Sequence, residues 1–154
     1  MLTGLFGLFL AGLAAATLLP FGSEPVVAAY LMSQTSQGPF SMAQAIAVVL
    51  AVGAGNTLGG VITYGMGAGV VNVWRRVRRA PTVASPPSPS LQRARRWLTR
   101  WGPAALILSW LPVVGDPLCL VAGGLKLPFW RCLLWMAIGK LGRYTVLVWV
   151  VLGF

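Results

Sequence analysis

Five apolar stretches of unequal length occupy most of this chain, and they leave room for little besides membrane helices. Residues 43–74 and 129–154 are each long enough to cross a hydrocarbon core of about 30 Å, which takes roughly 20 helical residues. Residues 2–19 are of borderline length and residues 26–32 are short. The remaining stretch, 103–125, is interrupted by proline and glycine. The pattern predicts an all-α integral membrane protein.

Charge is scarce, which excludes a water-soluble globule. Of the 154 residues, 57% are hydrophobic and 9% are charged, whereas a soluble domain carries about 25% charged residues. Twelve Lys and Arg stand against two acids, Glu24 and Asp116, and there is no histidine. We therefore exclude enzymes built on histidine chemistry and histidine-ligated metals, and we expect no cofactor and no metal. An enzyme of another kind is the least favoured class, because no nucleophile–base pair is evident.

Eight of the twelve cations lie between Arg75 and Arg100, in a segment without acids. Lys and Arg beside apolar spans mark the cytoplasmic side of a membrane. Residues 80–92 are rich in Pro, Ser and Ala, so we expect a flexible, extended connector there. We expect membrane lipids rather than nucleic acid as partners, with anionic head groups at Arg75, Arg76, Arg78 and Arg79.

The interrupted stretch predicts a re-entrant hairpin. Residues 103–111 form about 13 Å of α-helix, which reaches roughly the centre of the membrane. Residues 112–117 (PVVGDP) cannot continue a regular helix, because proline lacks the amide hydrogen and glycine is flexible. Residues 118–125 are long enough only to return. The tip, with Asp116, is therefore expected near mid-membrane, and the two cations that follow place the exit on the cytoplasmic side.

The same break occurs near the amino terminus. Residues 20–25 match residues 112–117, with proline at the first and sixth positions and an acid at the fifth. Each break is followed further on by a span with glycine five residues before tyrosine, Gly59 and Tyr64 in one half and Gly139 and Tyr144 in the other. We interpret this as an internal two-fold repeat. The predicted break residues are Pro20, Gly22, Pro25, Pro112, Gly115 and Pro117.

The two halves are expected to have opposite orientation in the membrane. Residues 33–41 are polar but uncharged, which suits the outer face. We therefore expect one membrane domain that spans the chain: a first repeat over about 1–74, a basic cytoplasmic loop over about 75–100 and a second repeat over about 101–154. Each repeat is a re-entrant hairpin plus a transmembrane helix. Inverted repeats with broken helices are a transporter architecture, and the sequence leaves a homo-oligomer open.

Four charged side chains are expected at membrane depth: Glu24, Asp116, Lys140 and Arg143. A charge there costs about 2.5–3.5 kcal/mol on the insertion scale, so such residues pair or serve a pathway. In one interpretation they form two ion pairs that dock the hairpins. In the other, the acids exchange protons and the cations bind a phosphate head group. The two interpretations are compatible if an ion pair opens to admit a ligand. Candidate cavity-lining residues, with interhelical hydrogen bonding as the alternative, are Ser23, Asn56, Ser109, Tyr64 and Tyr144.

Five motifs together carry a family resemblance. They are residues 19–24 (LPFGSE), 55–60 (GNTLGG), 108–116 (LSWLPVVGD), 120–123 (LVAG) and 139–144 (GKLGRY). They resemble the YqaA-like branch of the DedA membrane proteins, in the VTT-domain (SNARE-associated Golgi protein) group. The resemblance implies a bacterial inner-membrane protein with two opposed re-entrant hairpins. It also implies a role in moving lipids across the bilayer, undecaprenyl phosphate among them, with dependence on proton-motive force.

The resemblance assigns some residues and departs at others. Glu24 matches the acid of the first hairpin, but Ser109 and Gly115 stand where many DedA members carry arginine. Lys140 and Arg143 are the cations left to bind a phosphate. The sequence thus predicts a proton-coupled lipid transporter or scramblase. The alternatives are a non-transporting membrane factor in envelope homeostasis or membrane protein assembly, and a carrier for a small solute.

Overall fold

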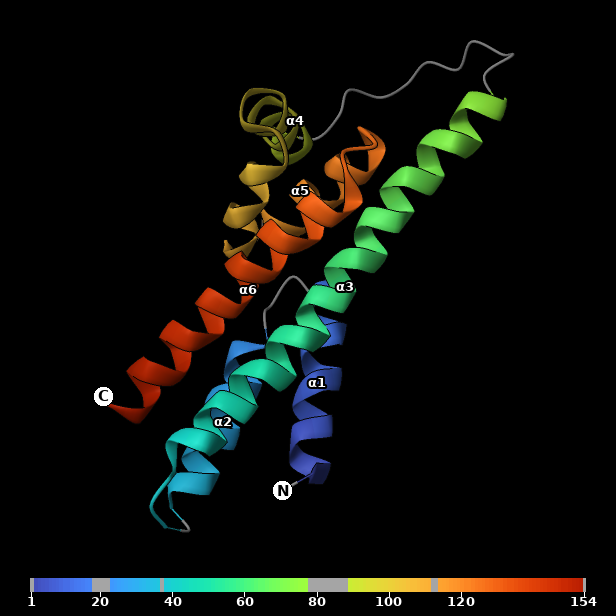
Figure 1. Cartoon of the computed structure of the whole chain (residues 1–154). Coiled ribbons are helices and arrows are strands. Elements are labelled where there is room, and N and C mark those ends of the chain that lie inside the picture. Colours follow the sequence, from blue (N-terminus) through green and yellow to red (C-terminus); the bar gives the residue numbers. More distant parts are fainter. Residues whose placement is uncertain (1, 18–22, 37, 78–88, 112–113, 154) are drawn as a thin grey trace.

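The computed structural model describes residues 2–17, 23–36, 38–77, 89–111 and 114–153, and every regular element in these ranges is a helix (Figure 1). The helices in chain order are α1 (Leu2–Thr17), α2 (Glu24–Thr35), α3 (Met42–Val77), α4 (Pro89–Trp101), the 3-10 helix η1 (Gly102–Trp110), α5 (Gly115–Gly124) and α6 (Phe129–Leu152). The prediction of an all-α fold is confirmed.

Two of these helices are long and apolar enough to cross a membrane. They are α3, over Met42–Gly69, and α6, over its full length, and both lie where long apolar stretches predicted crossings. Helix α1 is also apolar but shorter. Helices α3 and α6 contact each other at the centre of the molecule (Figure 1). Two apolar clusters surround this contact, one including Leu106 and Leu118 and the other Val27 and Val52.

The short helices are shared between the two halves of the chain. Helices α1 and α2 precede α3, and helices η1 and α5 precede α6. The first short helix of each half packs along its own long helix, α1 on α3 and η1 on α6. The second packs on the long helix of the other half, α2 on α6 and α5 on α3. This exchange ties the two halves together.

Both predicted breaks lead into the first turn of a short helix. Pro25 lies in the first turn of α2 and Pro117 in the first turn of α5, where the missing amide hydrogen costs no helical hydrogen bond. Glu24 and Asp116 lie in the same first turns, and a negative charge is favourable at the amino end of a helix. Gly115 begins α5. The other predicted break residues, Pro20, Gly22 and Pro112, lie outside the described residues.

The segment predicted to be the first arm of the second re-entrant hairpin is a 3-10 helix rather than an α-helix. Helix η1 has nine residues, and at about 2.0 Å per residue it extends about 18 Å, further than the 13 Å expected from α-helical geometry. Gly102 joins it to α4 with a φ of +60°, a left-handed conformation that favours glycine. The chain therefore turns sharply at Gly102, the first residue of η1.

Part of the predicted connector is helical. The expectation of an extended chain over 80–92 is wrong for residues 89–92, which begin α4. Ala94 and Leu98 lie four residues apart and are buried against α5 and η1, so tertiary packing stabilises this polar helix. Of the arginines expected at lipid head groups, Arg75 and Arg76 lie in the last turn of α3, and Arg78 and Arg79 lie outside the described residues.

Close backbone contacts hold α5 against α3. A Cβ at Gly67 of α3 would overlap the carbonyl oxygen of Leu120, and a Cβ at Gly123 of α5 would overlap that of Tyr64. Small residues permit this approach between membrane helices, where packing replaces the hydrophobic effect as the source of stability.

We predict that Gly67→Ala lowers the free energy of unfolding by about 1–3 kcal/mol, because the added methyl group forces α5 away from α3. Gly69→Ala is the matched control, since a Cβ at Gly69 of the same helix meets open space. The thermal midpoint of the purified protein in detergent measures both. Equal midpoints for the two variants would contradict the proposed contact.

Candidate functional site

An ion pair joins the first break to the last helix. Glu24, the first residue of α2, binds the guanidinium of Arg143 in α6 through its Oε1 atom. The two side chains remain 29% and 18% exposed, so the pair is only partly enclosed by protein. The structure thus brings together two of the four charged residues predicted at membrane depth. It does so because α2 packs on the long helix of the opposite half.

A buried polar cluster lies next to this ion pair in sequence and joins three elements. Tyr144 of α6 is at its centre: its hydroxyl is 2.6 Å from Ser23 Oγ and accepts a hydrogen bond of 2.7 Å from Asn56 Nδ2 of α3. All three side chains are buried. Ser23 occupies the N-cap position of α2, yet its hydroxyl makes no capping bond to the helix. It binds Tyr144 instead, and thereby fixes the start of α2 on α6.

Lys140 is the most deeply buried of the four charged residues. It is 2% exposed, and its Nζ donates a 2.7 Å hydrogen bond to the backbone oxygen of Asn56. Gly60 of α3 makes room for it, because a Cβ there would lie 3.1 Å from Nζ. Asp116 attracts Lys140 electrostatically from the first turn of α5, but the Asp116 residue itself is exposed. Among the described residues, no ion pair within 4 Å joins the two.

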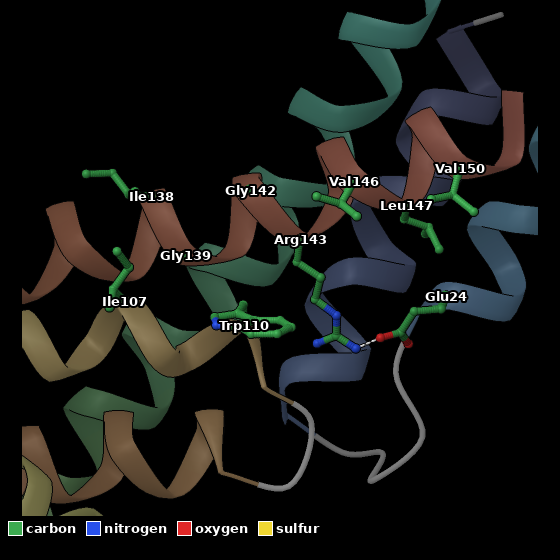
Figure 2. A pocket seen from close by; sticks show the side chains of 10 residues that line it. All are labelled: Glu24, Ile107, Trp110, Ile138, Gly139, Gly142, Arg143, Val146, Leu147 and Val150. Carbon is green, nitrogen blue, oxygen red and sulfur yellow. Dashed lines mark ion pairs between the residues drawn. The ribbon is translucent and has the colours of Figure 1, made fainter. Parts of the chain in front are cut away.

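A cavity of about 680 Å³ lies between η1 and α6. Its lining is apolar apart from the ion pair, and Figure 2 shows the Arg143 side chain reaching from α6 toward Glu24 with Trp110 close by. The lining residues are Glu24, Ile107, Trp110, Ile138, Gly139, Gly142, Arg143, Val146, Leu147 and Val150. A concave apolar site with a few polar groups is the usual form of a ligand-binding site. This one can accommodate a molecule with apolar chains and a charged end.

The other predicted lining residues lie outside this cavity. Ser109 hydrogen-bonds the backbone oxygen of Met136 at 3.5 Å and so joins η1 to α6. Tyr64 donates a 2.7 Å hydrogen bond to the backbone oxygen of Leu127, beyond the end of α5. These are the interhelical hydrogen bonds of the alternative interpretation. The buried cluster of Ser23, Asn56 and Tyr144 likewise makes interhelical bonds and does not line the cavity.

Sequence reasoning missed the apolar wall of the cavity. Trp110 is one of seven tryptophans in the chain, and nothing in its local sequence marks it as part of a binding site. On α6 a signal does exist: residues 139, 142, 146 and 150 recur every three or four positions around Arg143 and so share one helical face. The presence of η1 opposite that face could not be predicted, because it depends on tertiary packing.

Comparisons with known proteins identify the family of this chain. Residues 42–153 match the VTT domain. This chain belongs to the VTT domain family. It is 36% identical to the inner membrane protein YqaA of Escherichia coli (strain K12), over 92% of this chain and 86% of that protein, and YqaA of Shigella flexneri matches equally. An uncharacterized protein of Haemophilus influenzae is 35% identical over 93% of this chain and 84% of its own length.

These matches confirm two predictions about the VTT-domain chain. The resemblance to the YqaA-like branch of the DedA proteins is confirmed, and so is the location in the inner membrane, which the two long apolar helices also support. The names of the YqaA relatives describe membrane proteins and denote no enzyme. No solved structure matches this chain.

We predict that Tyr144→Phe lowers the free energy of unfolding by about 1–3 kcal/mol, because it leaves the Asn56 amide and the Ser23 hydroxyl buried without their partner. Ser23→Ala removes a single bond and has a smaller effect. A double-mutant cycle on thermal midpoints in detergent measures the coupling of the two. If the two effects add to within about 0.3–0.5 kcal/mol, the Ser23–Tyr144 bond contributes nothing.

Proposed function

We propose that this VTT-domain protein moves lipids between the leaflets of the inner membrane, as a proton-coupled transporter or scramblase. The observation that carries the proposal is the apolar cavity of about 680 Å³ whose lining includes one ion pair, Glu24–Arg143. Acyl chains fit the apolar wall between η1 and α6, and a head group fits the charged pair. The family resemblance to lipid-moving membrane proteins supports the same function.

The ion pair offers a means of admitting a phosphate-bearing lipid such as undecaprenyl phosphate. A guanidinium binds phosphate through paired hydrogen bonds, but here Glu24 occupies Arg143. Protonation of Glu24 removes its negative charge and releases Arg143 for the head group. Loss of the proton re-forms the ion pair and expels the head group. In this scheme one proton is taken up for each lipid that is bound.

We further propose that the two halves form an inverted repeat, which supplies the second half of the proposed cycle. Each half contributes a broken pair of short helices and one long helix, and each places its second short helix on the other half. When the two halves are aligned so that Gly59 matches Gly139, Thr63 of α3 falls at the position of Arg143 in α6. The second acid, Asp116, therefore has no arginine at the matching position. We propose that Lys140, which already attracts Asp116, pairs with it when Glu24–Arg143 opens.

A non-transporting membrane factor is the second candidate. It is favoured by the buried cluster of Ser23, Asn56 and Tyr144, whose hydrogen bonds are all made within the protein. In that case Glu24 and Arg143 serve to dock α2 on α6 and do not meet a ligand.

The cavity is tested by filling it. We predict that Gly142→Leu slows lipid movement in proteoliposomes by at least about tenfold, a barrier increase of about 1.4 kcal/mol, because Gly142 lines the cavity and its Cβ direction is open. Gly65→Leu is the control, since it adds the same side chain to open space on α3 away from the cavity. Fluorescently labelled phospholipids and undecaprenyl phosphate are the substrates. Wild-type rates for Gly142→Leu with both would contradict transport through this cavity.

Proton coupling is tested by neutralising the acids. We predict that Glu24→Gln and Asp116→Asn each abolish the response of lipid movement to an imposed pH gradient, because the first removes the carboxyl group that takes up the proton and the second removes the acid proposed to pair with Lys140. Rates with and without the gradient are measured in proteoliposomes.

The exchanged pair Glu24→Arg with Arg143→Glu separates the two candidate functions. If the protein is a transporter, the double variant restores the thermal midpoint but not pH-driven lipid movement, because the acid and the guanidinium have exchanged helices. Recovery of both properties would assign the pair to structure alone. Unchanged gradient responses in Glu24→Gln and Asp116→Asn would rule out coupling through these carboxyl groups.

A further inference from the structure

Helix α4 lies across one end of the helical bundle. Figure 1 shows it almost end-on, whereas α3 and α6 run across the view. The last turn of α3 and the turn between α5 and α6 lie at the same end of the molecule. Because α3 and α6 have the length and composition of membrane-crossing helices, a helix that lies across their end is placed at a membrane surface.

One face of α4 is buried in the protein and the opposite face carries arginine. Ala94 and Leu98 are buried in the cluster that includes residues of η1 and α5. The helical periodicity places Arg93, Arg96 and Arg100 on a single stripe on the other side, and all three are exposed. We call these three residues the arginine stripe.

Helix α4 carries two tryptophans besides the arginine stripe. Trp97 is partly buried against the protein, and Trp101, one turn further on, is 65% exposed. Trp130, at the start of α6, is 76% exposed. Tryptophan side chains concentrate at the boundary between hydrocarbon and water. The exposure of Trp101 at the end of α4 is typical of a helix that lies in the membrane interface.

The arginine stripe cannot be neutralised by this chain. The sequence has twelve Lys and Arg but only two acids, so most of its cations have no acidic side chain of their own to pair with. Glu24 is already paired with Arg143, and Asp116 attracts Lys140. A complementary anion must therefore come from outside the chain.

We propose that α4 is a membrane-surface helix whose arginine stripe binds the phosphate groups of anionic phospholipids in the adjacent leaflet. Guanidinium groups pair with phosphate through two hydrogen bonds at a time. The stripe spans two helical turns, about 10 Å, which is room for more than one head group. The bilayer is favoured over nucleic acid as the source of phosphate, because the exposed Trp101 on the same helix is a residue type that concentrates at the lipid interface. This binding does not depend on lipid transport through the cavity.

The test compares two triple variants that remove the same net charge. Arg93→Gln/Arg96→Gln/Arg100→Gln removes the stripe. Arg95→Gln/Lys126→Gln/Arg131→Gln removes three other exposed cations, one of them on the far flank of α4. The full-length proteins are reconstituted in nanodiscs of phosphatidylcholine with a minor fraction of phosphatidylglycerol. Native mass spectrometry then counts the phosphatidylglycerol that each protein retains.

We expect the stripe variant to retain at least about tenfold less phosphatidylglycerol than the wild type, and the control variant to retain nearly as much as the wild type. Equal losses of phosphatidylglycerol in both variants, or full retention by the stripe variant, would overturn the proposal. Retention of an oligonucleotide, added to the same nanodiscs, in place of the lipid would also overturn it. If the stripe variant does not fold, a salt titration of the wild type decides. Retained phosphatidylglycerol should fall as salt rises, and no change with salt would count against the stripe.

Discussion

Polar side chains inside a membrane must find their partners within the protein, because lipid tails offer no hydrogen bonds. In this chain that requirement falls on a few residues near the centre of α3 and α6. Tyr144 satisfies Asn56 and lies within hydrogen-bonding distance of Ser23, and Lys140 is held by the backbone of Asn56. The partners come from both halves of the chain. The packing of α2 on α6 therefore depends on polar groups that have no alternative partner in lipid.

The cavity differs from this buried polar cluster, because the ion pair in its lining is only partly buried. Its wall is apolar, while Glu24 and Arg143 lie in it as a partly exposed pair of opposite charges. A fully buried pair would be hard to open, and a fully exposed one would be screened by water. An intermediate degree of exposure suits a pair that exchanges partners. The deeply buried Lys140 has no acidic partner within ion-pair distance among the described residues and is held by its hydrogen bond to the Asn56 backbone.

Much of this architecture could be predicted from sequence, because apolar length and proline position act locally. The long helices, the breaks before Pro25 and Pro117 and the approach of Glu24 to a cation all follow from such patterns. Helix α4 could not be predicted, because its stability comes from the burial of Ala94 and Leu98 on distant elements. The central place of Tyr144 was also hidden, since its partners lie 88 and 121 residues away in the chain. The 3-10 form of η1 has no recognised sequence signal.

The exchange of α2 onto α6 also sets an order of assembly during synthesis. Tyr144 lies 121 residues after Ser23 in the chain. At about 5–20 residues per second, its synthesis follows that of Ser23 by roughly 6–24 seconds. Until α6 has left the ribosome, the start of α2 has neither its hydroxyl partner nor its arginine. The docking of the amino-terminal half is therefore complete only after α6 has been made. A nascent chain that stalls before residue 143 consequently keeps Ser23 and Glu24 without the partners that fix the start of α2.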